Sequence, residues 1–337
     1  MVELICDGDD DPTGLASRGP DGPVVDPTVL EVQDLDALPF PAHHLFMKPE
    51  YKVFHPTGVA RRWRWGFIMS SRGCPYGCIY CSPTLRNSYG TRARARRSAS
   101  VMRELLHLRA LGATVIHFRD DIFTLDRARV VDLCQAMIRR GFDLKWTAQT
   151  RPDRVDPELL GLMKRAGCAS IYFGVESGSP RILERIQKGS TVEQVEDAFA
   201  WSRRAGLFTV GFFMLGNPGE TEQDIQLTHD LLMRVRPDII QVAFFTPYPG
   251  SPVFCRADLE GQPLDAFSHY NKPSNQSAVS DQALRRWQRR FYLDFIFRSG
   301  FIGRTLRHQA LPNLVNLDKA LDLLRLSLRA LGPRREA

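Results

Sequence analysis

The sequence predicts an α/β protein built around a partial (β/α)6 TIM-like barrel, with an irregular N-terminal lead-in and a C-terminal helical extension. From residue 65 onward, short apolar runs rich in β-branched and aromatic residues alternate with longer segments of helical periodicity. Six such units in succession imply parallel strands joined by right-handed crossovers. Six units are too few for a closed eight-fold barrel, so we expect the sheet to stay open.

The individual elements follow from the same periodicity. The expected strands cover residues 65–70, 114–118, 145–149, 170–175, 208–214 and 239–245. The expected helices cover residues 99–111, 127–140, 157–166, 192–205 and 220–235. Asp126 and Asp156 precede two of these helices as N-caps. Helix ends are indicated by Gly112, Gly141, Gly167 and Gly206.

The two ends of the chain differ from this pattern. Residues 1–60 are rich in Pro, Asp and Gly and show no sustained period, so we interpret them as a linker-like segment. Within it, Leu35, Leu38 and Phe40 are expected to lie over a neighbouring surface. The barrel is expected to span residues 61–255, and residues 256–337 to form the extension, with helices at 281–298 and 314–331.

Bulk properties exclude several classes of protein. The net charge is +7, but the 45 basic residues are interleaved with 38 acidic ones, so no nucleic-acid partner is expected. The apolar runs are too short to span a bilayer and the N-terminus has no signal-peptide order, so we expect no membrane association and a cytoplasmic location. The seven cysteines are an odd number, and three of them are clustered, which does not indicate a disulfide framework.

The clustered cysteines follow the first expected strand in the segment SRGCPYGCIYCSP. Cys74, Cys78 and Cys81 can each ligate one iron of a [4Fe-4S] cluster and leave the fourth iron open. A structural zinc site is the alternative, but it usually needs a second Cys/His pair, and none stands out. An electron-transfer ferredoxin would need a fourth cysteine at motif distance. The open-iron cluster is therefore the favoured interpretation.

CxxxCxxC at the end of the first strand of a βα barrel resembles the signature of the radical S-adenosylmethionine (SAM) superfamily. The resemblance implies that SAM binds the open iron through its amino and carboxylate groups and is cleaved by one electron. The resulting 5′-deoxyadenosyl radical would abstract hydrogen from a small-molecule substrate. A flavodoxin- or ferredoxin-type protein is the implied electron donor.

The resemblance also implies cofactor contacts at the strand ends. Tyr80 occupies the adenine position, Asp120 and Asp121 stand at the SAM amine, and Arg151 is the expected partner of the SAM carboxylate. Glu176 and Ser177 are placed near the ribose, and Gly216 lies in an adenine-supporting element. The structural alternatives are that Asp120 caps a helix, that Arg151 pairs with Asp153, and that ESGS before Pro180 is a helix start. By position alone, the candidate substrate contacts are Arg119, Gln149, Asn217 and Tyr248.

The resemblance covers residues 30–310 and is greatest to methylthiotransferases and cobalamin-dependent radical SAM enzymes, although the cobalamin domain expected upstream is missing. We therefore expect a lyase- or oxidoreductase-type radical SAM enzyme, with methyl transfer less favoured. Its substrate would be a sugar or nucleoside in antibiotic biosynthesis, and the reaction a decarboxylation, dehydrogenation, epimerisation or deoxygenation. One alternative is a cobalamin-dependent methyltransferase with cobalamin supplied in trans; another is a non-catalytic iron–sulfur electron-transfer or scaffold subunit.

Overall fold

A single parallel sheet forms the centre of the computed structural model, which describes residues 16–19, 22–25, 32–47, 64–81, 90–248, 251–254 and 275–298. Its strand order is β10-β9-β8-β7-β6-β3, and every pairing is parallel. The strands are β3 (Trp65–Ile68), β6 (Val115–Phe118), β7 (Lys145–Thr150), β8 (Cys168–Glu176), β9 (Phe208–Leu215) and β10 (Ile239–Phe244). Within the described residues β3 and β10 do not pair with each other, so the predicted open barrel is confirmed.

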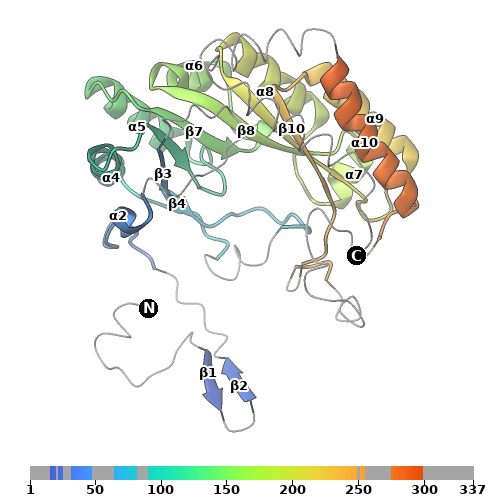
Figure 1. Ribbon diagram of the computed structural model, residues 1–337, viewed down its shortest axis with the longest axis horizontal. Helices are drawn as coiled ribbons and strands as arrows, with labels where there is room; N and C mark the ends of the chain where they lie inside the picture. The colour runs from blue at the N-terminus through green and yellow to red at the C-terminus, as the bar shows by residue number, and fades with distance from the viewer. Residues whose placement is uncertain are drawn as a thin grey trace.

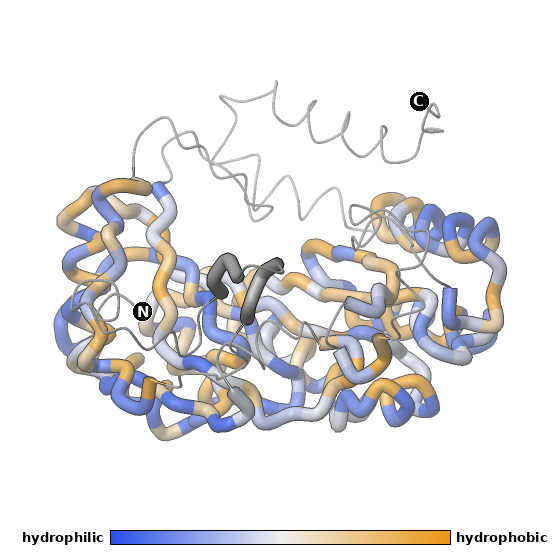
Figure 2. Tube along the Cα trace, turned by 90° about the horizontal axis from the view of Figure 1, so that it is seen from below, coloured by the Kyte–Doolittle hydropathy of each residue, from blue (hydrophilic) through white to orange (hydrophobic). Residues whose placement is uncertain are grey.

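The helices follow one another along one side of this sheet in the order of the strands (Figure 1). They are α4 (Ser98–Ala110), α5 (Arg127–Arg139), α6 (Pro157–Arg165), α8 (Val192–Arg204), α9 (Glu222–Val235) and α10 (Asp281–Phe297). Seen after a quarter turn, the described chain forms a broad arc (Figure 2). Each helix packs on its neighbour, as right-handed crossovers require.

The helix boundaries follow the capping residues. Asp126 accepts a hydrogen bond from the backbone N–H of Arg129, and Asp156 accepts one from Leu159, so both predicted N-caps are confirmed. The glycines predicted as helix stops all have positive φ angles. The helix expected from residue 220 begins at Glu222 instead, because Thr221 forms a capping box with Asp224.

Several short elements were not predicted. They are the hairpin of β1 (Ala16–Gly19) and β2 (Gly22–Val25), the ribbon of β4 (Ser71–Arg72) and β5 (Arg94–Ala95), α2 (His43–Phe46), α7 (Pro180–Arg185) and a 3-10 turn at Pro152–Arg154. Elements of two to six residues are too short to show a period. The helix expected at 314–331 and the predicted domain boundaries at residues 60 and 255 lie outside the described residues, and they stay predictions.

The linker segment lies against the first barrel helix, as expected. Leu35 is buried, and His43 Nε2 lies 2.7 Å from Glu104 Oε1 on α4. Arg96 also pairs with Glu104, and Asp36 accepts a hydrogen bond from the backbone N–H of Arg97 at 3.1 Å. Because Glu104 is a buried carboxylate, it depends on Arg96 for charge compensation, and His43 adds a second contact.

The core lies between the sheet and the helices. Its largest side chain, Trp146 on β7, packs 5.4 Å from the rings of Phe118 and Phe123 and donates from Nε1 to the carbonyl of Ala166 at 2.8 Å. Cys134 on α5 is completely buried in the same core. In the described part of the chain, no helix has the length and hydropathy that crossing a bilayer requires.

Replacing Trp146 by Ala should lower the free energy of unfolding by about 3–5 kcal/mol, because it empties a fully buried site and removes a buried hydrogen bond. Ile138→Ala on α5 is the control: its side chain is 43% exposed, so we expect a change within about 0.5 kcal/mol. Urea unfolding followed by circular dichroism measures both. Equal losses in the two variants would contradict this placement of the core.

Candidate functional site

The predicted site residues meet at the carboxyl edge of the sheet. The cysteine loop follows β3, the Asp120–Asp121 pair follows β6, and Arg151 follows β7. Glu176 ends β8, and Gly216 directly follows β9. Parallel pairing brings these strand ends to one edge, which is where chemistry lies in such barrels.

The cysteine loop is held by close backbone approaches. Gly73 has a φ of +89°, and a Cβ there would lie 2.3 Å from the carbonyl oxygen of Arg92, so only glycine fits. The backbone N–H of Ile79 donates to the carbonyl of Ile186 at 3.2 Å, and that of Cys81 to Cys78 at 3.2 Å. These contacts fix the second half of the loop against the segment that follows α7.

The three thiols are neighbours, but they are not gathered at ligand distance. Burial and the other two thiols raise the pKa of Cys81 to about 11, and burial also raises the pKa of Cys74. Among the described residues, no three Cys, His, Asp or Glu side chains are grouped tightly enough to hold one metal ion. The soft, three-thiol donor set fits an iron–sulfur cluster, whose binding would draw the thiols together and deprotonate them.

Arg151 lies buried beside this loop. Its guanidinium stacks 3.6 Å above the ring of Tyr76, donates from Nε to Asp153 Oδ1 at 2.8 Å, and places Nη1 3.8 Å from Cys78 Sγ. The structural alternative, a pairing with Asp153, is therefore present. Even so, Nη2 is buried with no hydrogen-bond partner in the described part of the chain. A buried guanidinium nitrogen without a partner is costly, which makes it a candidate ligand contact.

The two aspartates after β6 have different environments. Asp120 is fully buried and accepts hydrogen bonds from the Ser70 backbone N–H at 2.6 Å, from the Ser70 hydroxyl and from the Ser71 hydroxyl at 2.8 Å. It thus ties β6 to the base of the cysteine loop and caps no helix. Asp121 accepts from the backbone N–H of Gly73, but its Oδ2 is buried and unpartnered among the described residues. Burial and the Asp120 charge raise the pKa of Asp121.

Tyr80 and Glu176 are brought together by a residue that the sequence did not single out. Lys188, buried in the turn after α7, donates to the Tyr80 hydroxyl at 3.0 Å and to Glu176 Oε1 at 3.1 Å. Glu176 has a φ of +68° next to a register shift in β8, which re-aims its side chain. Gln187 before Lys188 also has a positive φ, a local feature that periodicity does not reveal.

Three predicted contacts take part in internal hydrogen bonds. Ser177 is fully buried against Thr228, with the two hydroxyl oxygens 3.1 Å apart. Gly216 donates its backbone N–H to Glu220 Oε2 at 2.6 Å, and Asn217 donates from Nδ2 to Glu220 Oε1 at 2.9 Å. Burial raises the pKa of Glu220 to about 7. These residues stabilise the β9 loop, and their predicted ligand contacts stay predictions.

The other proposed substrate contacts are spread along the same edge. Arg119 is exposed, and its Nη1 lies 3.5 Å from His117 Nε2. Gln149 donates to the carbonyl of Asp120 at 3.1 Å. Tyr248 is half-buried after β10, and its carbonyl accepts from Ser251 at 2.9 Å. Their substrate roles stay predictions.

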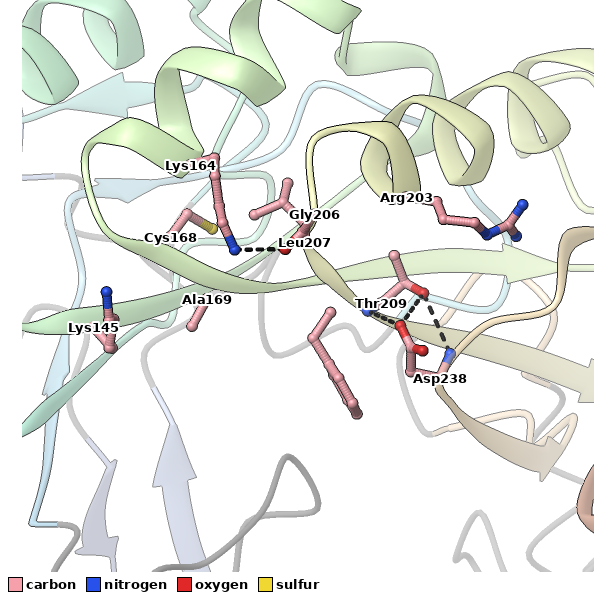
Figure 3. Close-up of a pocket in the computed structure, with 10 residues that line it drawn as sticks. Lys145, Lys164, Cys168, Ala169, Arg203, Gly206, Leu207, Thr209 and Asp238 are labelled. Atoms are coloured by element: carbon pink, nitrogen blue, oxygen red, sulfur yellow. Dashed lines mark hydrogen bonds between the residues drawn. The ribbon is translucent and has the colours of Figure 1, made fainter. Parts of the chain in front are cut away.

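A hollow of about 290 Å³ lies at the opposite edge of the sheet, near the starts of β7, β8 and β9 (Figure 3). Its walls include Lys145, Cys168 and Leu207. Here Lys164 donates to the carbonyl of Gly206, and Asp238 Oδ2 accepts from the backbone N–H of Thr209 at 2.8 Å (Figure 3). These bonds hold the connections that lead into β9 and β10. The hollow lies at the edge of the sheet opposite to the cysteine loop.

Comparison with known proteins identifies the family. Residues 68–232 match the radical SAM superfamily. The chain is 37% identical over 222 residues to an uncharacterized methyltransferase of Pyrococcus horikoshii, covering 65% of this chain and 46% of the relative. It is 31% identical over 229 residues to cytidylyl-2-hydroxyethylphosphonate methyltransferase of Streptomyces wedmorensis, covering 64% and 42%. The chain therefore spans less than half the length of these relatives.

Solved structures show the same fold. The radical SAM methyltransferase TsrM of Kitasatospora setae, with tryptophan substrate and a SAM analogue bound, has a TM-score of 0.55 and 25% identity, covering 72% of this chain and 48% of that one. A second structure of TsrM, with cobalamin and a [4Fe-4S] cluster bound, has a TM-score of 0.58 at 24% identity, covering 74% and 49%.

These comparisons confirm the predicted superfamily, and the predicted cluster and SAM are the cofactors that this superfamily uses. The prediction that methyl transfer is the less favoured chemistry is wrong, because relatives that match the barrel are named methyltransferases. That prediction relied on a missing upstream domain, whereas the similarity lies in the barrel itself. The lyase or oxidoreductase class and the link to antibiotic biosynthesis are not confirmed. The electron donor and the cytoplasmic location stay predictions.

Cys78→Ala should abolish iron loading, because a cluster held by three thiolates loses one ligand. Cys134→Ala is the matched control: this thiol lies in the α5 core, and its loss should leave the iron content unchanged. Iron per chain after anaerobic reconstitution measures both. Wild-type iron content in the Cys78 variant would contradict the ligand assignment.

Glu220→Gln tests the buried carboxyl on the β9 loop. The pKa of Glu220 is about 7 in the folded protein and 4.5 ordinarily, so the folded state binds the proton more tightly than the unfolded state does. The contribution of protonated Glu220 to the free energy of unfolding therefore falls as the pH rises from the lower pKa to the higher one. The variant, which has no proton to lose, should gain stability relative to the wild type from about pH 5 to about pH 8, by about 1.4 kcal/mol per unit of pKa change. Denaturant unfolding at both pH values measures the difference, and a pH-independent difference would contradict the assignment.

Proposed function

Because residues 68–232 of this chain belong to the radical SAM superfamily, we propose that the protein is a radical SAM methyltransferase that acts on a small molecule with cobalamin as methyl carrier. The observation that carries the proposal is the 37% identity over 222 residues to a relative named as an uncharacterized methyltransferase. The 31% identity to a second methyltransferase supports it. The substrate and the partners are part of the proposal, because the chain spans less than half of each relative.

The cysteine loop would hold the cluster through Cys74, Cys78 and Cys81. A [4Fe-4S] cluster bound there supplies the electron that cleaves SAM. The chain itself contributes the buried base of the loop, where Asp120 fixes Ser70 and Ser71 and so sets the direction in which the loop leaves β3. Burial of Cys78 limits the access of water to its thiol.

Two buried atoms beside this loop, which have no partner among the described residues, suit the amino-acid end of SAM. Arg151 Nη2 is a buried cationic donor, and Asp121 Oδ2 is a buried acceptor. A SAM molecule carries a carboxylate and an ammonium group on one carbon, so it would satisfy a donor and an acceptor together. Stacking on Tyr76 and the bond to Asp153 hold the Arg151 guanidinium in a fixed plane before a ligand arrives.

Cobalamin does not fit the described residues. Upstream of β3 these residues form only the β1–β2 hairpin and the segment around α2, with no second α/β layer for a nucleotide-sized cofactor. We propose that it reaches the site from outside the described residues. A non-catalytic iron–sulfur subunit would have no use for the buried donor and acceptor beside the loop, so this alternative has less support.

Turnover under anaerobic conditions tests the proposal. The reconstituted protein is given dithionite in place of a flavodoxin or ferredoxin, methyl-deuterated SAM, and cobalamin, with tryptophan or cytidylyl-2-hydroxyethylphosphonate as trial substrates. We expect both S-adenosylhomocysteine and 5′-deoxyadenosine, with a deuterated methyl group in the product and no turnover without cobalamin. Mass spectrometry measures all three, and Cys78→Ala is the inactive control.

The same experiment separates the alternatives. 5′-Deoxyadenosine without S-adenosylhomocysteine would contradict methyl transfer and indicate hydrogen abstraction alone. The absence of both products from a cluster-loaded protein would contradict catalysis on these substrates and on SAM.

A further inference from the structure

Lys188 is a buried cation beside the cysteine loop. Its side chain is only 5% exposed, and its Nζ has a partner on each of two other elements. One is the hydroxyl of Tyr80, next to the third cysteine, at 3.0 Å; the other is Glu176 Oε1, at the end of β8, at 3.1 Å. The ammonium group therefore links the end of a core strand to the loop that carries the thiols.

The turn that carries Lys188 is itself tightly placed against that loop. The carbonyl of Ile186 accepts the backbone N–H of Ile79 at 3.2 Å. A Cβ on Gly77 would approach Gln187 Oε1 to 3.2 Å, which leaves no room for a layer of water between the two segments. The backbone of this turn is therefore fixed against the loop, and the two hydrogen bonds of Lys188 hold its ammonium group beside Tyr80.

The charge of Lys188 lies close to the thiols. Its Nζ donates to the hydroxyl of Tyr80, the residue directly before Cys81, in the turn that the backbone hydrogen bond from Cys81 to Cys78 closes. Coulomb interactions are strong in a buried environment, so the same charge would act on any electron added to a group held by these thiols. Net charge and hydrogen bonding around a cluster are among the factors that set its reduction potential.

We propose that Lys188 is a positioning residue that fixes the turn of the third cysteine through Tyr80, and that its buried positive charge raises the reduction potential of the cluster on this loop. The inference rests on the cluster-binding part of the proposed function and not on methyl transfer. Reduction adds one negative charge to the cluster, and a nearby cation stabilises the reduced form more than the oxidised form. Glu176 acts with the opposite sign, because it is an anion at the same place.

The test is a redox titration of the anaerobically reconstituted full chain without SAM, followed by electron paramagnetic resonance. Lys188→Met should shift the midpoint potential to more negative values, and Lys188→Arg should restore most of the shift. Glu176→Gln should shift the midpoint in the positive direction. Lys164→Met is the matched control: it removes the same charge at the opposite edge of the sheet, so the midpoint should not move (Figure 3).

Iron release to a chelator tests the positioning role. Tyr80→Phe removes the hydroxyl but keeps the ring and the Lys188 charge, so it should release iron severalfold faster than the wild type while the midpoint stays near that of the wild type. Lys188→Met should show both changes. Wild-type release rates in both variants would overturn the positioning role.

Each outcome is decisive. A Lys188→Met midpoint equal to that of the wild type, or shifts of the same sign in the Lys188 and Glu176 variants, would overturn the electrostatic role. If Lys188→Met binds no cluster, the Glu176→Gln shift decides alone. A wild-type chain that binds no cluster would overturn the proposed function together with this inference, whereas a cluster with unshifted potentials would overturn this inference only.

Discussion

Parallel pairing is the constraint on which the candidate site depends. Because all six strands run in one direction, their carboxyl ends share one edge, and the loops that leave them converge there. The buried carboxylate of Asp120, which follows β6, joins two of these loops. It accepts hydrogen bonds from Ser70 and Ser71, which follow the neighbouring strand β3. The cysteine loop therefore begins from a point that is fixed by the sheet and not by the loop itself.

Buried polar groups at this edge divide into two kinds. Asp120, Ser177 and Glu220 have their hydrogen bonds satisfied inside the protein, and they hold the loops in place. Arg151 and Asp121 each keep one buried atom without a partner among the described residues. An unsatisfied buried group costs stability, and a ligand that carries both a carboxylate and an ammonium group would supply a partner to each of these two atoms.

Charge balance at the cysteine loop also comes from several elements. Arg151 approaches Cys78 from the end of β7, while Lys188 approaches the other half of the loop through Tyr80. The three thiolates that would hold a cluster repel one another, and these two cations would offset that repulsion. The loop, the strand ends and the turn after α7 thus form one electrostatic unit.

The sequence by itself determined the order and direction of the strands, the capped starts of the helices and the three-cysteine segment. These features are local: a helix start or an apolar period is decided by residues within a few positions of one another. Only the tertiary structure decided that Asp120 is internal while Asp121 keeps one oxygen without a partner in the described part of the chain, and that Lys188 joins Tyr80 to Glu176. Those outcomes depend on partners 50 and 108 positions apart, whose meeting is set by how the strands pack.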